Sequence, residues 1–200
     1  ISISYQDELI VREDNLRLLI NNLKGDCDEF IAPKKEHLGD IIFGNTKDSN
    51  DELINYTGNS VISPRAFLLP QSEVLFEITS VRSSGFSQIA DKKKRIFYGV
   101  RPCDIKAIGL MRQFFLGSLR DEFYKEKNEN SLFISLACTE RCLKDSFCYE
   151  MNSGPVAEEG FDLQLIALND GYLVEIGSKK GNSIIKKNKE LFTKASSSKQ

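Results

Sequence analysis

Two short apolar runs in the middle of the chain predict neighbouring strands joined by a helix. Residues 95–100 (RIFYGV) follow a charged Lys92-Lys-Lys turn, and residues 132–137 (LFISLA) form the second run. Between them, apolar side chains recur at the spacing of one helix face, at Ile105, Ile108, Met111 and Phe115. A strand, a helix and a strand within about 45 residues predict a right-handed crossover whose two strands are parallel.

The first third of the chain carries weaker signals of mixed type. Leucine and isoleucine within residues 13–23 form an amphipathic stripe, which predicts a helix that ends at Gly25. Residues 30–33 and 38–43 are short enough to be strands of a small hairpin, and residues 44–51 form a polar loop. Ser63 before Pro64 is a helix-start signal, whereas residues 73–78 are an apolar run of undetermined type.

The last third predicts an antiparallel pair of strands, because residues 162–168 and 172–176 flank an Asn-Asp-Gly turn. The expected fold is therefore α/β with α+β character at the ends, built on a mixed sheet with a central strand–helix–strand crossover and a C-terminal β-hairpin. We expect one domain over residues 1–194, with residues 1–60 as an alternative small subdomain, and a disordered tail over residues 195–200.

Composition excludes several classes of function. The chain has 200 residues, 40% of them apolar, and a net charge of -2, so it can bury a core but has no basic field to attract nucleic acid. No run approaches the roughly 18 apolar residues of a membrane span, and the N-terminus does not read as a signal peptide. A cytoplasmic location is the expectation, and Ile1 in place of Met suggests that part of the parent protein is missing.

The chemistry-bearing residues are cysteines that follow the two central strands. Cys103 comes after residues 95–100, and Cys138, Cys142 and Cys148 come after residues 132–137. Because open α/β sheets place their ligands at the carboxyl ends of the strands, we expect four thiols to meet at one end of the sheet. The start of the following helix would stabilise a thiolate at Cys103. Four soft sulfurs suit an iron–sulfur cluster or zinc rather than magnesium.

The cysteine spacing leaves alternatives open. Three residues separate Cys138 from Cys142 and five separate Cys142 from Cys148, unlike the paired two-residue gaps of zinc ribbons and bacterial ferredoxins. Free cysteines are often no more than small buried hydrophobes, which is how we interpret Cys27. A scaffold with zinc or no metal, and a thiol–disulfide switch between Cys142 and Cys148, therefore remain alternatives.

Other candidate residues are fewer. Arg101 could raise a reduction potential or bind an anion, and could equally anchor backbone carbonyls. Asp104 is interpreted as a helix cap more than as an acid, and the single His37 lies in a polar stretch and receives no role. The phosphate-binding patterns GxGxxG and GxxxxGK are both absent from the sequence, which disfavours nucleotide binding.

Several stretches together carry a resemblance to a known family. They are residues 99–108 (GVRPCDIKAI), the 138–148 loop followed by Gly154-Pro155, residues 160–163 (GFDL) and, upstream, residues 61–76 (VISPRAFLLPQSEVLF). These stretches resemble the β subunit of cytosolic sulfhydrogenases and the A subunit of anaerobic sulfite reductase, over roughly residues 30–181. One departure is that the family's Cys-Phe-Cys triplet is Ser146-Phe147-Cys148 here.

The resemblance implies an electron-transfer role rather than an enzyme complete in itself. In this family, such a region precedes a ferredoxin-like domain with two [4Fe–4S] clusters, which connects a flavin- and NAD(P)H-binding subunit to a hydrogenase or sulfite-reducing subunit. The present sequence contains no Cys-x-x-Cys-x-x-Cys run, so that ferredoxin domain is absent from this chain. If the region itself binds a [4Fe–4S] cluster, the matching ligands are Cys103, Cys138 and Cys148, with Cys142 standing in for the sulfur that Ser146 lacks.

Overall fold

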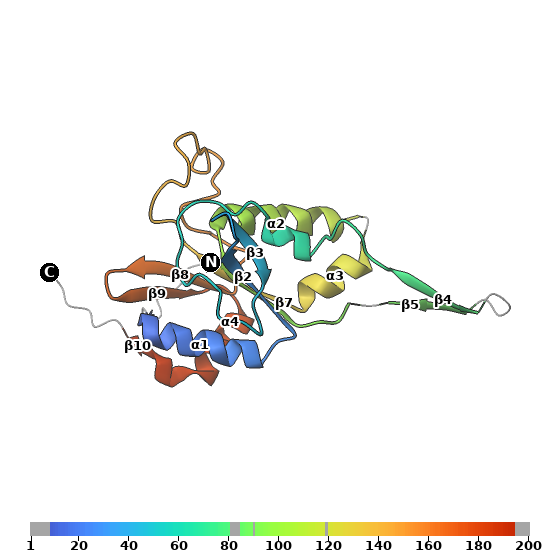
Figure 1. Cartoon of the computed structure of the whole chain (residues 1–200), viewed down its shortest axis with the longest axis horizontal. Coiled ribbons are helices and arrows are strands. Elements are labelled where there is room, and N and C mark those ends of the chain that lie inside the picture. The colour runs from blue at the N-terminus through green and yellow to red at the C-terminus, as the bar shows by residue number, and fades with distance from the viewer. Residues whose placement is uncertain (1–8, 81–84, 90, 119, 195–200) are drawn as a thin grey trace.

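The computed structural model describes residues 9–80, 85–89, 91–118 and 120–194. A mixed eight-stranded sheet organises them, with the strand order β10-β1-β9-β8-β7-β6-β2-β3 (Figure 1). The strands are β1 (Leu9–Val11), β2 (Glu29–Lys35), β3 (Ile41–Asn45), β6 (Arg95–Val100), β7 (Ser131–Leu136), β8 (Leu163–Leu168), β9 (Gly171–Ile176) and β10 (Phe192–Lys194). The expected α/β architecture is thereby confirmed. The expected tail over residues 195–200 lies outside the described residues.

The central strands pair as the hydrophobic pattern predicts. β6 and β7 are parallel, and the run continues with β2 parallel to β6 and β8 parallel to β7. The two expected hairpins are antiparallel, β2 with β3 and β8 with β9. Parallel strands end at a common edge of the sheet, so the chain leaves β6 and β7 at neighbouring points.

Helices cover both faces of the sheet and define two apolar cores (Figure 1). α1 (Glu13–Gly25) and α4 (Lys179–Lys187) pack on one face, with Leu16 and Ile184 among the buried residues. α2 (Pro102–Phe115) and α3 (Glu122–Glu129) pack on the other, with Ile108 and Tyr124 buried there. Both cores therefore share the central strands, and β6 is buried along its whole length, as parallel strands usually are.

A β-bulge at Gly99 sets the direction in which β6 ends. The pairing register with β7 shifts between Tyr98 and Val100, and Gly99 has a φ of 73°, in the left-handed region. Tyr98 therefore packs into the core beneath α1, while Val100, two residues on, packs into the core beneath α2. A side chain at Gly99 would stand 3.1 Å from the ring of Pro33, so glycine is also the residue that fits.

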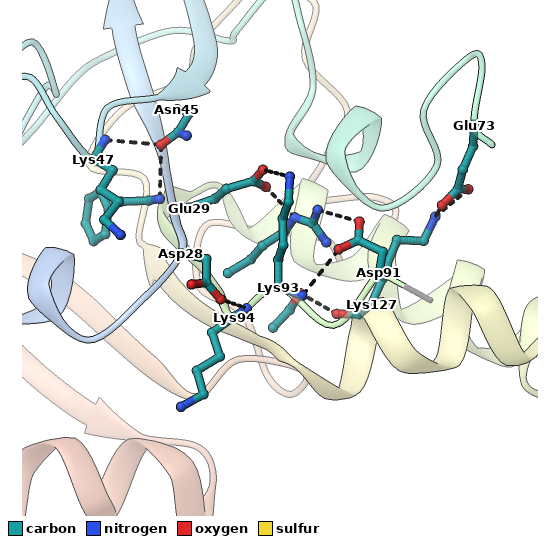
Figure 2. Close-up of polar contacts among 12 residues, drawn as sticks. Asp28, Glu29, Asn45, Lys47, Glu73, Asp91, Lys93, Lys94 and Lys127 are labelled. Carbon is teal, nitrogen blue, oxygen red and sulfur yellow. Dashed lines mark hydrogen bonds and ion pairs between the residues drawn. The ribbon is translucent and has the colours of Figure 1, made fainter. Parts of the chain in front are cut away.

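A two-stranded ribbon, β4 (Phe76–Ser80) and β5 (Gly85–Gln88), projects from the sheet (Figure 1). Ion pairs hold both ends of the segment that carries it (Figure 2). On the entering side, Glu73 accepts hydrogen bonds from the buried ammonium of Lys127 in α3. On the returning side, Arg95 donates to Glu29 and Asp91. These contacts fix the ends of the ribbon segment against the body of the protein.

Of the two residues predicted to cap the start of a helix, Ser63 does so and Asp104 does not. Ser63 accepts a hydrogen bond from the backbone N–H of Arg65 and begins a short 3₁₀ helix, η1 (Pro64–Phe67), as its position before Pro64 predicts. Asp104, predicted to cap α2, does not do so. The helix already begins at Pro102, the preceding Arg101 makes no side-chain cap, and the carboxylate of Asp104 accepts instead from the hydroxyl of Ser63 at 2.7 Å.

Several further elements escaped prediction, most of them because they are short or contain few apolar residues. α3 contains only two apolar residues, and β1 and β10 are three residues long. α4 and a second 3₁₀ turn, η2 (Lys189–Leu191), follow β9. Among the described residues, no helix is long and apolar enough to cross a membrane.

Candidate functional site

The four candidate cysteines lie at the end of the sheet where β6 and β7 finish. Cys103 is in the first turn of α2, directly after β6, and Cys138 is separated from β7 only by Ala137. All four thiols are free and half-buried, neither exposed on the surface nor packed into the two cores. The topology therefore brings the two cysteine-bearing segments to one edge, as the sequence predicts.

Backbone hydrogen bonds fold the second cysteine loop back on itself. The loop between β7 and β8 projects beyond the start of α2 (Figure 1). The amide of Cys138 donates to the carbonyl of Pro155 at 2.9 Å, and the amide of Ser153 donates to the carbonyl of Cys148 at 2.8 Å. A side chain at Gly154 would lie 3.7 Å from the sulfur of Cys148, so Gly154 leaves open space beside that thiol.

The thiols influence one another electrostatically. Burial raises the pKa of Cys103 to about 11, with the nearby Asp104 and Cys138 adding to the rise. Burial also raises the pKa of Cys138, the charge of Arg101 counteracts part of that rise, and Cys142 and Cys148 reinforce it. The expectation that the helix start stabilises a thiolate at Cys103 is therefore wrong, because burial and the neighbouring carboxylate disfavour the charged form and the net pKa is raised.

Arg101 occupies the centre of this region. It is 4% exposed, and its guanidinium donates to the carbonyls of Leu136 and Ala137 at 3.3 and 3.1 Å. It also donates to the carbonyl of Tyr56 and lies over the Tyr56 ring, 3.9 Å from the centroid. Arg101 therefore anchors backbone carbonyls, which is one of the two roles expected for it, and its role in binding a cofactor stays a prediction. Its Nε, however, is buried without a hydrogen-bond partner.

A small cavity adjoins Arg101 and two of the thiols. Its lining includes Arg101, Cys138, Cys142, Thr57 and Gly58, with Thr139 and Glu140 on the same wall. Asp104 is not part of that lining. Burial raises the pKa of its carboxyl, although its contacts with Ser63 and Arg65 oppose that rise.

The donors are of a kind that binds soft metals, but their positions in the described part of the chain do not form a metal site. Within the described residues, no three Cys, His, Asp or Glu side chains are gathered closely enough to hold a metal ion. The cysteine loop between β7 and β8 has turns and bends but no helix or strand over residues 138–161.

Two other predicted residues lie away from this region. Cys27 is 5% exposed in the core beneath α1, its Sγ is 3.7 Å from the carbonyl of Lys24, and burial raises its pKa to about 11. The interpretation of Cys27 as a structural residue agrees with this position. His37 is exposed in the turn between β2 and β3.

Tyr56 is the site residue that sequence reasoning missed. Its hydroxyl donates to the carbonyl of Gly99 at 2.9 Å, and its ring and carbonyl hold Arg101. Tyr56 lies 45 positions before Arg101, in a segment without strand or helix periodicity, so no local pattern connects the two. Only the folded chain reveals the contact.

Comparison with known proteins gives one informative similarity. The chain is 28% identical over 146 residues to the protein named sulfhydrogenase 2 subunit beta from Pyrococcus furiosus, over 72% of this chain and 41% of that protein. The chain thus spans less than half the length of that curated relative. No family model matches the chain, and no solved structure matches it. The similarity supports a distant relation to that hydrogenase subunit.

Proposed function

We propose that this chain is part of an iron–sulfur electron-transfer subunit of an oxidoreductase complex of hydrogenase or sulfite reductase type. The observation that carries the proposal is that the parallel strands β6 and β7 end side by side and bring two segments with four half-buried thiols to one edge of the sheet, beside the buried guanidinium of Arg101. Uncharged small cysteines packed as core residues would not need a buried cation beside them.

The proposed ligands are Cys103, Cys138 and Cys148, with Cys142 as the fourth. A [4Fe–4S] cluster bound there would supply one-electron transfer. Segments of the chain itself enclose the proposed site. Cys103 is held at the start of α2, and the hydrogen bonds of Ser153 and Pro155 keep the second loop folded over the sheet end. Arg101, buried beneath the loop, offers positive charge to any anionic group bound there.

The proposed partners are a flavin- and NAD(P)H-binding subunit and a hydrogenase or sulfite-reducing catalytic subunit. The name of the relative, a β subunit of a sulfhydrogenase, supports membership of a multisubunit complex. Large apolar side chains exposed around the cysteine loop are compatible with a protein neighbour, among them Leu143, Phe147, Tyr149 and Met151. The free thiols support a reducing, cytoplasmic setting.

The test is anaerobic purification, reconstitution with iron and sulfide, and analysis for iron, sulfide and zinc. We expect about four irons per chain and visible absorbance that dithionite bleaches. Serine variants of Cys103, Cys138 and Cys148 should lose most of the iron, whereas the matched control Cys27→Ser should retain it, because Cys27 lies in the opposite core.

Other outcomes would assign the chain to a different class. Zinc without sulfide, or no metal in any preparation, would contradict the electron-transfer role and identify a scaffold. Reversible loss of two hydrogens on oxidation, mapped to a Cys142–Cys148 bond and without metal, would identify a thiol–disulfide switch. Serine replacement of Cys142 alone decides whether it serves as the fourth ligand.

A further inference from the structure

Arg101 differs from the other buried cations that the structure describes in having no acidic partner. Four lysine or arginine side chains are buried, Lys24, Arg95, Arg101 and Lys127. Lys24 pairs with Glu52, Arg95 with Glu29 and Asp91, and Lys127 with Glu73; the last pair is drawn in Figure 2. Within the described ranges, no carboxylate forms an ion pair with Arg101.

The contacts that Arg101 makes leave its charge uncompensated. Backbone carbonyls and the face of the Tyr56 ring stabilise a cation only through dipoles and a ring quadrupole. A buried lysine can avoid such a burden by releasing its proton, but a guanidinium stays charged in proteins. A buried ion without a full opposite charge is unfavourable, so the position of Arg101 favours the binding of an anion.

One donor of the Arg101 guanidinium is left over. Nη1 donates to the carbonyls of Leu136 and Ala137, and Nη2 donates to the carbonyl of Tyr56. Nε is buried and has no hydrogen-bond partner in the part of the chain that the structure describes. Because the guanidinium is planar and rigid, Nε–H cannot turn toward another acceptor without breaking the bonds of the two Nη atoms. Nε–H is therefore a donor available to a bound group.

The small cavity beside Arg101 limits the size of that group. The space open to the centre of a water-sized group is about 10 Å³, which is room for one small ion and not for a larger molecule. Thr57 and Glu140 line the cavity and are exposed, so it communicates with solvent. Only two cysteines, Cys138 and Cys142, are in the lining, and no group of three possible metal ligands occurs among the described residues. The cavity therefore suits a small anion better than a metal ion.

We infer that this cavity binds a small inorganic anion of about the size of chloride, held by the buried guanidinium of Arg101. The inference does not depend on the proposed function, because the binding requires neither iron nor sulfide. The anion supplies a full opposite charge and accepts a charge-assisted hydrogen bond from Nε–H, which is stronger than a bond between neutral groups. Glu140 is the one acid in the lining, and solvent screens its repulsion of the anion because its side chain is exposed.

Two measurements on the full chain, purified without added iron or sulfide, test the site. Crystals soaked in sodium bromide should show an anomalous diffraction peak in contact with Nε of Arg101. In solution, sodium chloride should raise the melting temperature above the value in sodium gluconate at equal ionic strength. An ion that binds only the folded chain stabilises it, and gluconate is too large for the cavity.

Two substitutions remove the site in different ways. Arg101→Gln keeps a polar side chain without its charge, so it should lose the bromide peak and weaken chloride binding at least about tenfold. Thr57→Glu leaves Arg101 in place and gives it a carboxylate from the exposed side of the cavity, so it should displace the anion and remove the chloride dependence even if Arg101→Gln fails to fold. Thr57→Gln is its uncharged control and should bind as the wild type does.

Two charge changes on the cysteine loop calibrate the effect. Glu140→Gln removes the acid from the lining and should tighten chloride binding. Arg141→Gln removes a positive charge from the next residue, which is exposed and is not part of the lining, and should leave chloride binding unchanged. Weaker binding in Glu140→Gln, or a loss in Arg141→Gln as large as that in Arg101→Gln, would contradict an anion held by the buried guanidinium.

The remaining outcomes separate this inference from the proposed function. A water molecule at Nε in place of bromide, or the same chloride dependence in the wild type, Arg101→Gln and Thr57→Glu, overturns the inference. Equal losses in Thr57→Glu and Thr57→Gln also overturn it, because shape and not charge would then control binding. A chain that binds bromide but takes up no iron supports the inference and contradicts the proposed function. A chain that takes up iron on reconstitution but binds no bromide without iron does the reverse.

Discussion

The ammonium nitrogen of Lys127 lies 2.7 Å from a carboxylate oxygen of Glu73, a residue 54 positions earlier in the chain. Lys127 is 2% exposed on α3, and Glu73 stands just before the projecting β4–β5 ribbon. The pair therefore ties the start of the ribbon segment to the body. Its two members are unequal, because the lysine is buried and the glutamate is partly solvated.

Glu73→Gln should destabilise the protein by about 2 kcal/mol, because it leaves a buried ammonium without its counter-charge. Urea unfolding at neutral pH measures the loss. The double variant Lys127→Met/Glu73→Gln should recover most of it, since no unpaired buried charge remains. A double variant as unstable as the sum of the two single variants would show that the pair is not coupled.

The fold could be predicted furthest where apolar residues gather in periodic runs. β6, β7 and α2 follow directly from such runs, and the parallel order of the two strands follows from the helical crossover between them, although that crossover holds α3 as well as α2. The bulge at Gly99 could not be predicted in this way, because the glycine is placed by the ring of Pro33, which is far away in sequence. Local periodicity carries no information on such distant contacts.

The candidate site, like the fold, could be predicted from the sequence only in part. Strand ends predicted which edge the cysteines share, but not that a buried Arg101 lies beside Cys138 and Cys142 without an acid partner among the described residues. That property depends on Tyr56 and on the carbonyls of Leu136 and Ala137, which come from two segments far from Arg101 in the sequence. The expected thiolate at Cys103 failed for the same reason, since burial of the thiol is a property of the assembled fold.

Gly181→Ala and Gly109→Ala should change stability in opposite directions, although both positions lie in helices. A side chain at Gly181 would stand 1.9 Å from the backbone carbonyl oxygen of Asp162, so α4 could not keep its place against β8. We expect a loss of at least about 2 kcal/mol. Nothing lies within 4 Å of a side chain at Gly109, so alanine there should add about 0.5–1 kcal/mol. Thermal unfolding followed by circular dichroism measures both, and equal melting temperatures would contradict the packing of α4.

The ion pairs around Arg95 should make stability fall in acid. Burial raises the pKa of Glu29, but hydrogen bonds from Lys93 and Arg95 outweigh this effect, so the net pKa of Glu29 is lowered. Burial likewise raises the pKa of Asp91, and the hydrogen bond and charge of Arg95 outweigh it, so the pKa of Asp91 is also lowered. A carboxyl whose pKa is lower in the folded chain stabilises the fold above its unfolded pKa of about 4, and that contribution is lost as the pH falls through the folded value.

Glu29→Gln/Asp91→Asn should therefore lose about 2 kcal/mol at pH 7 and lose much less additional stability between pH 5 and pH 2 than the wild type does. Urea midpoints at pH 7, 5, 4, 3 and 2 measure the difference. The exposed Glu158 supplies the control, and Glu158→Gln should follow the wild-type curve. Parallel acid profiles of the wild type and the double variant would contradict the assignment to these two carboxyls.

The Gly99 bulge should matter for metal retention as well as for stability, because it sets where β6 delivers Arg101 and Cys103. Gly99→Ala combines a φ of 73° with a contact at 3.1 Å from Pro33, whereas Gly39→Ala has a φ of 87° and no atom within 4 Å. Both variants incur the backbone strain of about 1 kcal/mol. Only Gly99→Ala should also push β6 away from β2, and it should therefore lose iron on reconstitution while Gly39→Ala retains the wild-type amount. Iron analysis beside urea unfolding separates the two effects, and full iron content in Gly99→Ala would show that the cysteine segments meet without the bulge.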